Sequence, residues 1–80
     1  MVTNLYVIYD RLAGECSPIS LAPNDAVACR QFYSYIQNGR LNPVEFQLYK
    51  IGTLDSCTMK LSNTEKLEVP TAKNGDGEGL

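Results

Sequence analysis

The chain has 80 residues and a formal net charge of −2, with 44% hydrophobic and 20% charged residues. This length supports one domain with a thin core, of a kind that is often completed by a partner subunit. The negative balance argues against a protein that coats nucleic acid through charge alone. The absence of histidine from the sequence excludes Cys/His zinc sites and catalytic Ser-His-Asp or Cys-His arrangements.

The three cysteines, Cys16, Cys29 and Cys57, bear on the compartment of the protein. An odd number of cysteines without a C-x-x-C spacing is a poor disulfide framework. The first residues lack the basic stretch and the long apolar segment of a secretory signal, and no apolar run is long enough to span a bilayer. We therefore expect a cytoplasmic protein without a membrane partner.

The first predicted element is a strand over residues 5–9, with the sequence Leu-Tyr-Val-Ile-Tyr. These residue types favour strands, and because both faces are apolar the strand is expected at the centre of a sheet. Residues 10–18 are predicted to form a connection with a turn at Ala13-Gly14, and residues 19–21 a short edge strand.

An amphipathic helix over residues 25–37 is the clearest element. Asn24 is a good N-cap residue, Asp25 suits the positive end of the helix dipole, and Gly39 is a natural stop. At 100° per residue, one apolar and aromatic stripe forms that is expected to face the core. Its members are Ala28, Cys29, Phe32, Tyr33, Tyr35 and Ile36.

The second main strand is predicted over residues 45–51, with Phe46 and Leu48 on one face and Tyr49 and Ile51 on the other. Gly52 marks a bulge or the end of the strand, and residues 57–61 predict a weaker third strand.

The predicted fold class is α+β: a small β-sheet of three to four strands with one amphipathic helix packed on one face. A single domain over residues 1–69 is followed by a flexible, acidic, glycine-rich tail over residues 70–80, which is expected to be disordered. One helix covers only one face of the sheet, yet both main strands carry apolar side chains on both faces. We expect a second copy of the chain, a host or viral protein, or stacked bases to cover the other face.

No pattern predicts catalysis, a cofactor or a metal, so the chain is not expected to be an enzyme. Residues 75–79, Gly-Asp-Gly-Glu-Gly, lack the strand and the helix that flank a phosphate-binding loop. Asp25 is explained by helix capping, and Asp10 and Glu15 flank a turn, so a magnesium site is the weaker interpretation. Cys29 lies on the apolar stripe and is expected to be a buried, inert thiol.

Six basic residues are interleaved with the five tyrosines: Arg11, Arg30, Arg40, Lys50, Lys60 and Lys66 with Tyr6, Tyr9, Tyr33, Tyr35 and Tyr49. Single-strand binders use such a combination to join phosphate attraction to base stacking. The alternative is that the tyrosines belong to the core or to an interface and the charges are scattered. The negative net charge and the lack of a basic run favour that alternative. The residues predicted to bind nucleic acid or a partner are Tyr6, Arg30, Arg40, Tyr49, Lys50 and Lys60.

Several segments together resemble a known family. They are residues 5–10, residues 17–19, residues 24–32 (Asn-Asp-Ala-Val-Ala-Cys-Arg-Gln-Phe), residues 46–52 (Phe-Gln-Leu-Tyr-Lys-Ile-Gly) and Asp55. With them the chain resembles the small nonstructural protein of gokushovirus-type microviruses, single-stranded DNA phages related to the chlamydial phages. The resemblance covers about residues 4–55, and residues 24–32 and 48–52 are its most specific parts.

The resemblance implies a nonstructural phage accessory protein that acts in the host cell cytoplasm like the packaging protein of other microviruses. Such a protein engages the viral replication complex, stops duplex synthesis and directs new single strands into the procapsid. It brings no catalytic residues. The expected partners are single-stranded viral DNA, viral replication or procapsid proteins, and further copies of the chain. The alternative is an adaptor that oligomerises or binds a host factor without contacting DNA.

Overall fold

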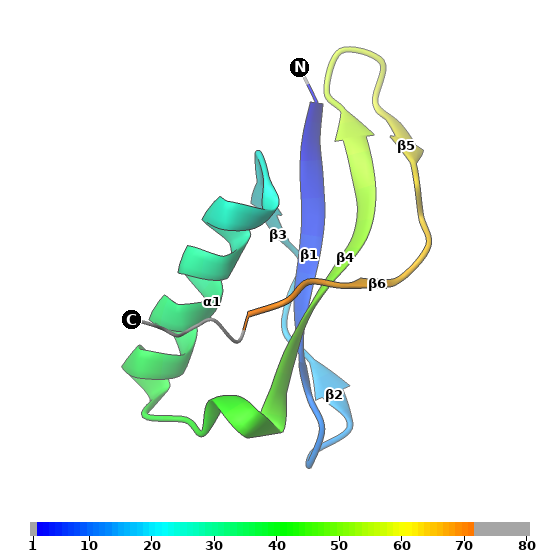
Figure 1. Cartoon of the computed structure of the whole chain (residues 1–80). Coiled ribbons are helices and arrows are strands. Elements are labelled where there is room, and N and C mark those ends of the chain that lie inside the picture. The colour runs from blue at the N-terminus through cyan, green and yellow to red at the C-terminus, as the bar shows by residue number, and fades with distance from the viewer. Residues whose placement is uncertain (1, 72–80) are drawn as a thin grey trace.

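The computed structural model describes residues 2–71 and shows one long helix beside an antiparallel sheet (Figure 1). Of the tail predicted over residues 70–80, residues 72–80 lie outside the described residues. The strands are β1 (Val2–Asp10), β2 (Glu15–Cys16), β3 (Ser20–Ala22), β4 (Phe46–Asp55), β5 (Lys60–Ser62) and β6 (Leu67–Glu68). The helix is α1 (Asp25–Gly39), and a 3₁₀ turn, η1 (Pro43–Glu45), precedes β4.

The two long strands form the centre of the sheet. β1 and β4 pair from Val2 opposite Asp55 to Asp10 opposite Phe46, which confirms the predicted central strand. The short strands extend this pair: β2 and β3 pair with β1, and β5 and β6 pair with β4. The sheet therefore has six strands, and the expected number of three to four is wrong. Strands of two or three residues are too short to show a period of two in the sequence.

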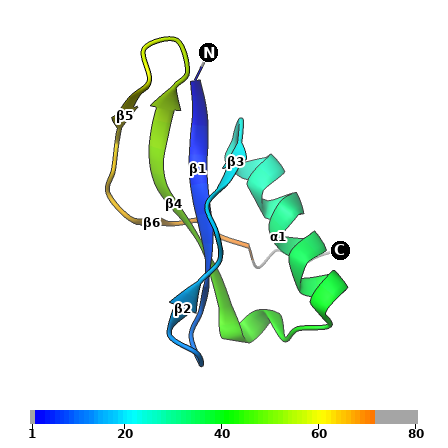
Figure 2. The same ribbon diagram turned by 180° about the vertical axis from the view of Figure 1, so that it is seen from behind.

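A β-bulge near the middle of β4 changes the pairing register. Leu5 lies opposite Gly52 whereas Tyr6 lies opposite Lys50, so Ile51 is the extra residue. Of the two alternatives predicted for Gly52, the bulge is confirmed and the strand end is wrong, because β4 continues to Asp55. A bulge bends its strand and increases the local twist, and the central pair is strongly twisted in both ribbon views (Figures 1 and 2).

The helix begins as its sequence predicts. The Asn24 side chain accepts a hydrogen bond from the Val27 amide at 2.9 Å, which satisfies one free N–H group of the first turn. Ala28, Phe32 and Ile36 are buried on the inner side.

The outer side of the helix and its C-terminal end differ from expectation. Tyr33 and Tyr35 are 38% and 44% exposed, so they lie at the edge of the apolar stripe and not in the core. The helix runs through Gly39, and the left-handed residue that ends it is Arg40, with φ 52°.

The core lies between α1 and one face of the sheet. Its largest fully buried side chains are Tyr6 from β1, Phe32 from α1 and Leu48 from β4. After β6 the chain crosses towards α1, as both ribbon views show, and Val69 closes the core at 2% exposure. The Cys29 thiol donates a hydrogen bond to the Pro70 carbonyl at 3.4 Å. Pro70, predicted to begin the tail, thus lies against the helix.

Replacing Arg40 with glycine should raise the free energy of unfolding by about 0.5–1 kcal/mol. A side chain is disfavoured in the left-handed conformation, and glycine is the usual residue at this position after a helix. Urea denaturation of both proteins measures the change. Arg40→Ala is the control, because it removes the charge and keeps the strain. Equal stability of the glycine and alanine variants would contradict the prediction.

Candidate functional site

The helix leaves the second face of the sheet without a layer of its own (Figures 1 and 2). Because side chains alternate along a strand, the neighbours of the buried Tyr6 and Leu48 point to this second face. We call it the open face. The side chains of the two central strands that lie on the open face are Leu5, Val7, Tyr9, Gln47, Tyr49 and Leu54.

Two tyrosines and a lysine gather at one end of the open face, which we call the tyrosine end. The rings of Tyr9 and Tyr49 meet edge to face, with their centroids 6.3 Å apart. The Lys66 ammonium lies 5.2 Å from the centroid of the Tyr49 ring, within the range of a cation–π interaction. Both rings are half-buried, so each keeps an accessible part.

A second cation is fixed beside the tyrosine end. Arg11 donates one hydrogen bond to the Gln47 side chain at 2.9 Å and another to the Val44 carbonyl. Gln47 lies directly opposite Tyr9 on the neighbouring strand. One anion also lies here, because Glu68 pairs with Tyr49 in the register of β6 and β4. Cations and anions therefore both lie near the tyrosine pair, since Glu45 also accepts a backbone hydrogen bond from Arg11.

The other end of the open face is aliphatic. Leu5 lies opposite both Leu21 and Gly52, and Leu54 lies opposite Leu61. Leu21 is 52% exposed and Leu61 59% exposed. A Cβ at Gly52 would lie 3.4 Å from a methyl carbon of Leu5, so the glycine leaves room for that side chain. We call these four leucines the aliphatic end.

Tyr6, one of the predicted binding residues, lies in the core and not on a surface. It is 0% exposed, and its hydroxyl donates a hydrogen bond to Asp25 at 2.6 Å and accepts one from Asn4 at 3.1 Å. Burial and the hydrogen bond to the Asp25 carboxylate raise the pKa of Tyr6 to about 12. Because the Tyr6 ring is fully buried, it is unable to stack on a base in this structure.

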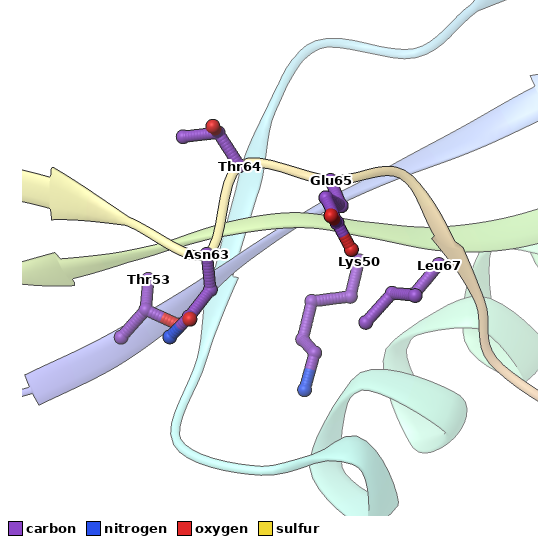
Figure 3. Close-up of a pocket in the computed structure, with 6 residues that line it drawn as sticks. All are labelled: Lys50, Thr53, Asn63, Thr64, Glu65 and Leu67. Carbon is purple, nitrogen blue, oxygen red and sulfur yellow. The ribbon is translucent and has the colours of Figure 1, made fainter.

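The predicted basic residues do not share a surface with Tyr49. Lys50 lies opposite Tyr6 and so points to the helix side of the sheet. It lines a groove beside the connection from β5 to β6 (Figure 3). Arg30 is exposed on α1, and Arg40 ends that helix. Lys60 begins β5, where it lies opposite Asp55 in the strand register. Of the six predicted residues, only Tyr49 lies on the open face.

Tyr9 and Lys66 belong to the wider set of tyrosines and basic residues noted in the sequence, but not to the six residues predicted to bind. Tyr9 follows Leu5 and Val7 at a spacing of two, so alternation alone groups it with that face. Lys66 has no comparable signal, because the return of the chain from β5 to β6 places it over Tyr49.

The described residues, 2–71, contain no group of three or more histidine, cysteine, aspartate or glutamate side chains that could hold a metal ion. In the same part of the chain, no helix has the length and apolar character needed to cross a membrane.

Comparison with known proteins places the chain in a family. No curated protein and no solved structure matches the chain. A family model described as "Phage ORF5 protein" matches residues 3–74, a span that includes nearly all of β1 and every element after it. Because the match covers most of the chain, including both ends of the open face, the protein belongs to the phage ORF5 protein family.

Proposed function

We propose that this phage accessory protein binds single-stranded DNA through the tyrosine end of its open face. The observation that carries the proposal is the Tyr9–Tyr49 pair with the Lys66 ammonium over one ring. In this proposal the protein is a nonstructural protein of a gokushovirus-type microvirus. It serves genome replication and packaging in the host cell cytoplasm, with viral replication or procapsid proteins as further partners. It acts by binding and not by catalysis.

The geometry suits bases better than a duplex. Aromatic rings on a sheet accept the flat face of any base, and each stacked base contributes about 1–3 kcal/mol. In this proposal the two cations beside the rings, Lys66 and Arg11, pair with the phosphates of a stacked strand. With about two phosphates neutralised, the logarithm of the binding constant should fall with a slope of about −1.4 against the logarithm of salt concentration. This modest slope agrees with the net charge of −2.

Tyr49→Ala should weaken binding to an oligothymidylate about ten-fold, because it removes one stacking surface and the partner of Lys66. Fluorescence anisotropy of a labelled oligonucleotide measures this change. Tyr49→Phe should bind as the parent does, since it keeps the ring. Tyr35→Ala is the matched control, because Tyr35 is a partly exposed tyrosine on α1, away from the open face. A folded Tyr49→Ala protein with unchanged affinity would overturn the proposal.

The aliphatic end favours a second candidate function, in which the protein is an adaptor that does not contact DNA. Leu21 and Leu61 are each more than half exposed beside their cross-strand leucine partners. A second copy of the chain would bury both pairs. This candidate predicts a stable dimer in solution and no binding to oligonucleotides. Mass measurement alongside the anisotropy titration separates the two functions.

A further inference from the structure

A polar groove lies on the helix side of the sheet, separate from the open face. Its volume is about 490 Å³, and Figure 3 shows two lining residues on β4 and the others on the returning chain beside it. The lining residues are Lys50, Thr53, Asn63, Thr64, Glu65 and Leu67.

The ammonium of Lys50 is a candidate for binding an anionic ligand. Lys50 is half-buried, and its side chain extends away from the β4 ribbon in Figure 3. Within residues 2–71 its ammonium makes neither a hydrogen bond nor an ion pair. A cation partly withdrawn from water is costly unless an anion or several acceptors replace its hydration. An anionic ligand in the groove would supply them.

The neighbours of Lys50 suit a small polar anion attached to a larger group. The Thr53 hydroxyl donates to Asn4 at 3.2 Å, which helps to hold it in place. Asn63 adopts the left-handed conformation with φ 52°, which asparagine tolerates better than most residues, and it turns the chain at the groove. The Asn63 amide is a hydrogen-bond donor on the same side as Lys50, whereas the Thr64 side chain points to the other side of the connecting chain in Figure 3. Leu67, 47% exposed, supplies an apolar wall.

We propose that this groove binds the phosphate of a nucleotide. The Lys50 ammonium pairs with the phosphate oxygens, the Asn63 amide donates a hydrogen bond to them, and Leu67 packs against the sugar or the base. Glu65, on the rim, opposes the ligand by charge and limits the affinity.

The source of the phosphate is a free nucleotide or the backbone of a bound strand. The connection from β5 to β6 separates the two sites: Asn63, Thr64 and Glu65 line the groove, and Lys66 reaches the tyrosine end. A DNA strand stacked on Tyr49 would therefore cross the connection from β5 to β6 and place the phosphate of a neighbouring nucleotide at Lys50. Only this second source rests on the proposed function.

The test is a titration of the full chain, labelled with ¹⁵N, with deoxythymidine monophosphate, followed by NMR. The resonances of Lys50, Thr53 and Asn63 should shift, and thymidine, which lacks the phosphate, should leave them unchanged. Lys50→Met should weaken binding about ten-fold, as expected for loss of a hydrogen-bonded charge, and Lys50→Arg should restore most of it. Glu65→Gln should strengthen binding two- to five-fold, about the effect of one exposed charge. Dispersed spectra establish that each variant is folded.

A second titration identifies the source and keeps the two proposals distinguishable. Shifts with the mononucleotide assign the groove to free nucleotides, and shifts only with an oligothymidylate lacking terminal phosphates assign it to the strand backbone. Tyr49→Ala should leave mononucleotide binding intact even if it abolishes strand binding. No shift with either ligand, an equal response to thymidine, or unchanged binding by folded Lys50→Met overturns the inference.

Discussion

Phe32→Ala is expected to lower the free energy of unfolding by about 3–5 kcal/mol, the usual cost of truncating a buried phenylalanine. Phe32 is 1% exposed and belongs to the same buried cluster as Tyr6, Leu48 and Val69. The substitution removes a ring from a core that is only one helix deep. Small domains are stable by about 5–15 kcal/mol in total, so the variant should be near the limit of folding at 37 °C.

Urea denaturation followed by circular dichroism measures this loss, since the chain has no tryptophan to serve as a fluorescent probe. Arg30→Ala is the matched control, because Arg30 is an exposed residue on the same helix. It should change stability by no more than about 0.5 kcal/mol. A cost below about 1 kcal/mol for Phe32→Ala would mean that α1 does not pack on the sheet through this side chain.

Tyr6→Phe is expected to cost about 1.5–3 kcal/mol at neutral pH, because it removes a hydrogen bond to the Asp25 carboxylate and keeps the ring. This bond ties β1 to the first turn of α1. Its contribution also depends on pH. The pKa of Tyr6 is raised from 10.0 to about 12 in the folded protein, so the folded state holds this proton more tightly than the unfolded state. The stabilisation is complete below pH 10 and is lost as the pH rises to about 12.

The difference between the parent and Tyr6→Phe isolates this effect from the titration of the other tyrosines and the lysines. Urea denaturation from pH 7 to pH 12 measures the free energy of unfolding of both proteins. The difference between the two values should decrease by roughly 2 kcal/mol as the pH rises from 10 to 12. A constant difference across this range would show that the Tyr6 proton is not bound more tightly in the folded state.

Local signals in the sequence predicted the helix and the central strands, because each depends on neighbours along the chain. Asn24 caps α1 as expected, and residues 5–9 lie at the centre of the sheet. These local signals did not predict which face of the sheet packs against the helix. Both faces of β1 are apolar, so Tyr6 and Tyr9 look alike in the sequence, although Tyr6 is buried under the helix and Tyr9 lies on the open face.

The candidate site depends on contacts between distant parts of the chain. Lys66 meets Tyr49 only because the chain turns back after β5 and pairs again with β4 at Leu67 and Glu68. The same return brings Val69 into the core. A two-residue strand carries no periodic signal, so the sequence predicted neither the position of Lys66 nor the burial of Val69.

The most direct test of the proposed function is ¹⁹F NMR of the protein with fluorotyrosine at its five tyrosines, during titration with an oligothymidylate. The signals of Tyr9 and Tyr49 should shift, since their rings form the tyrosine end of the open face. The signals of Tyr6, Tyr33 and Tyr35 should stay in place, because these residues lie in the core or on α1. Single Tyr→Phe variants assign each signal. Shifts confined to Tyr33 and Tyr35, or no shift at all, would contradict the account.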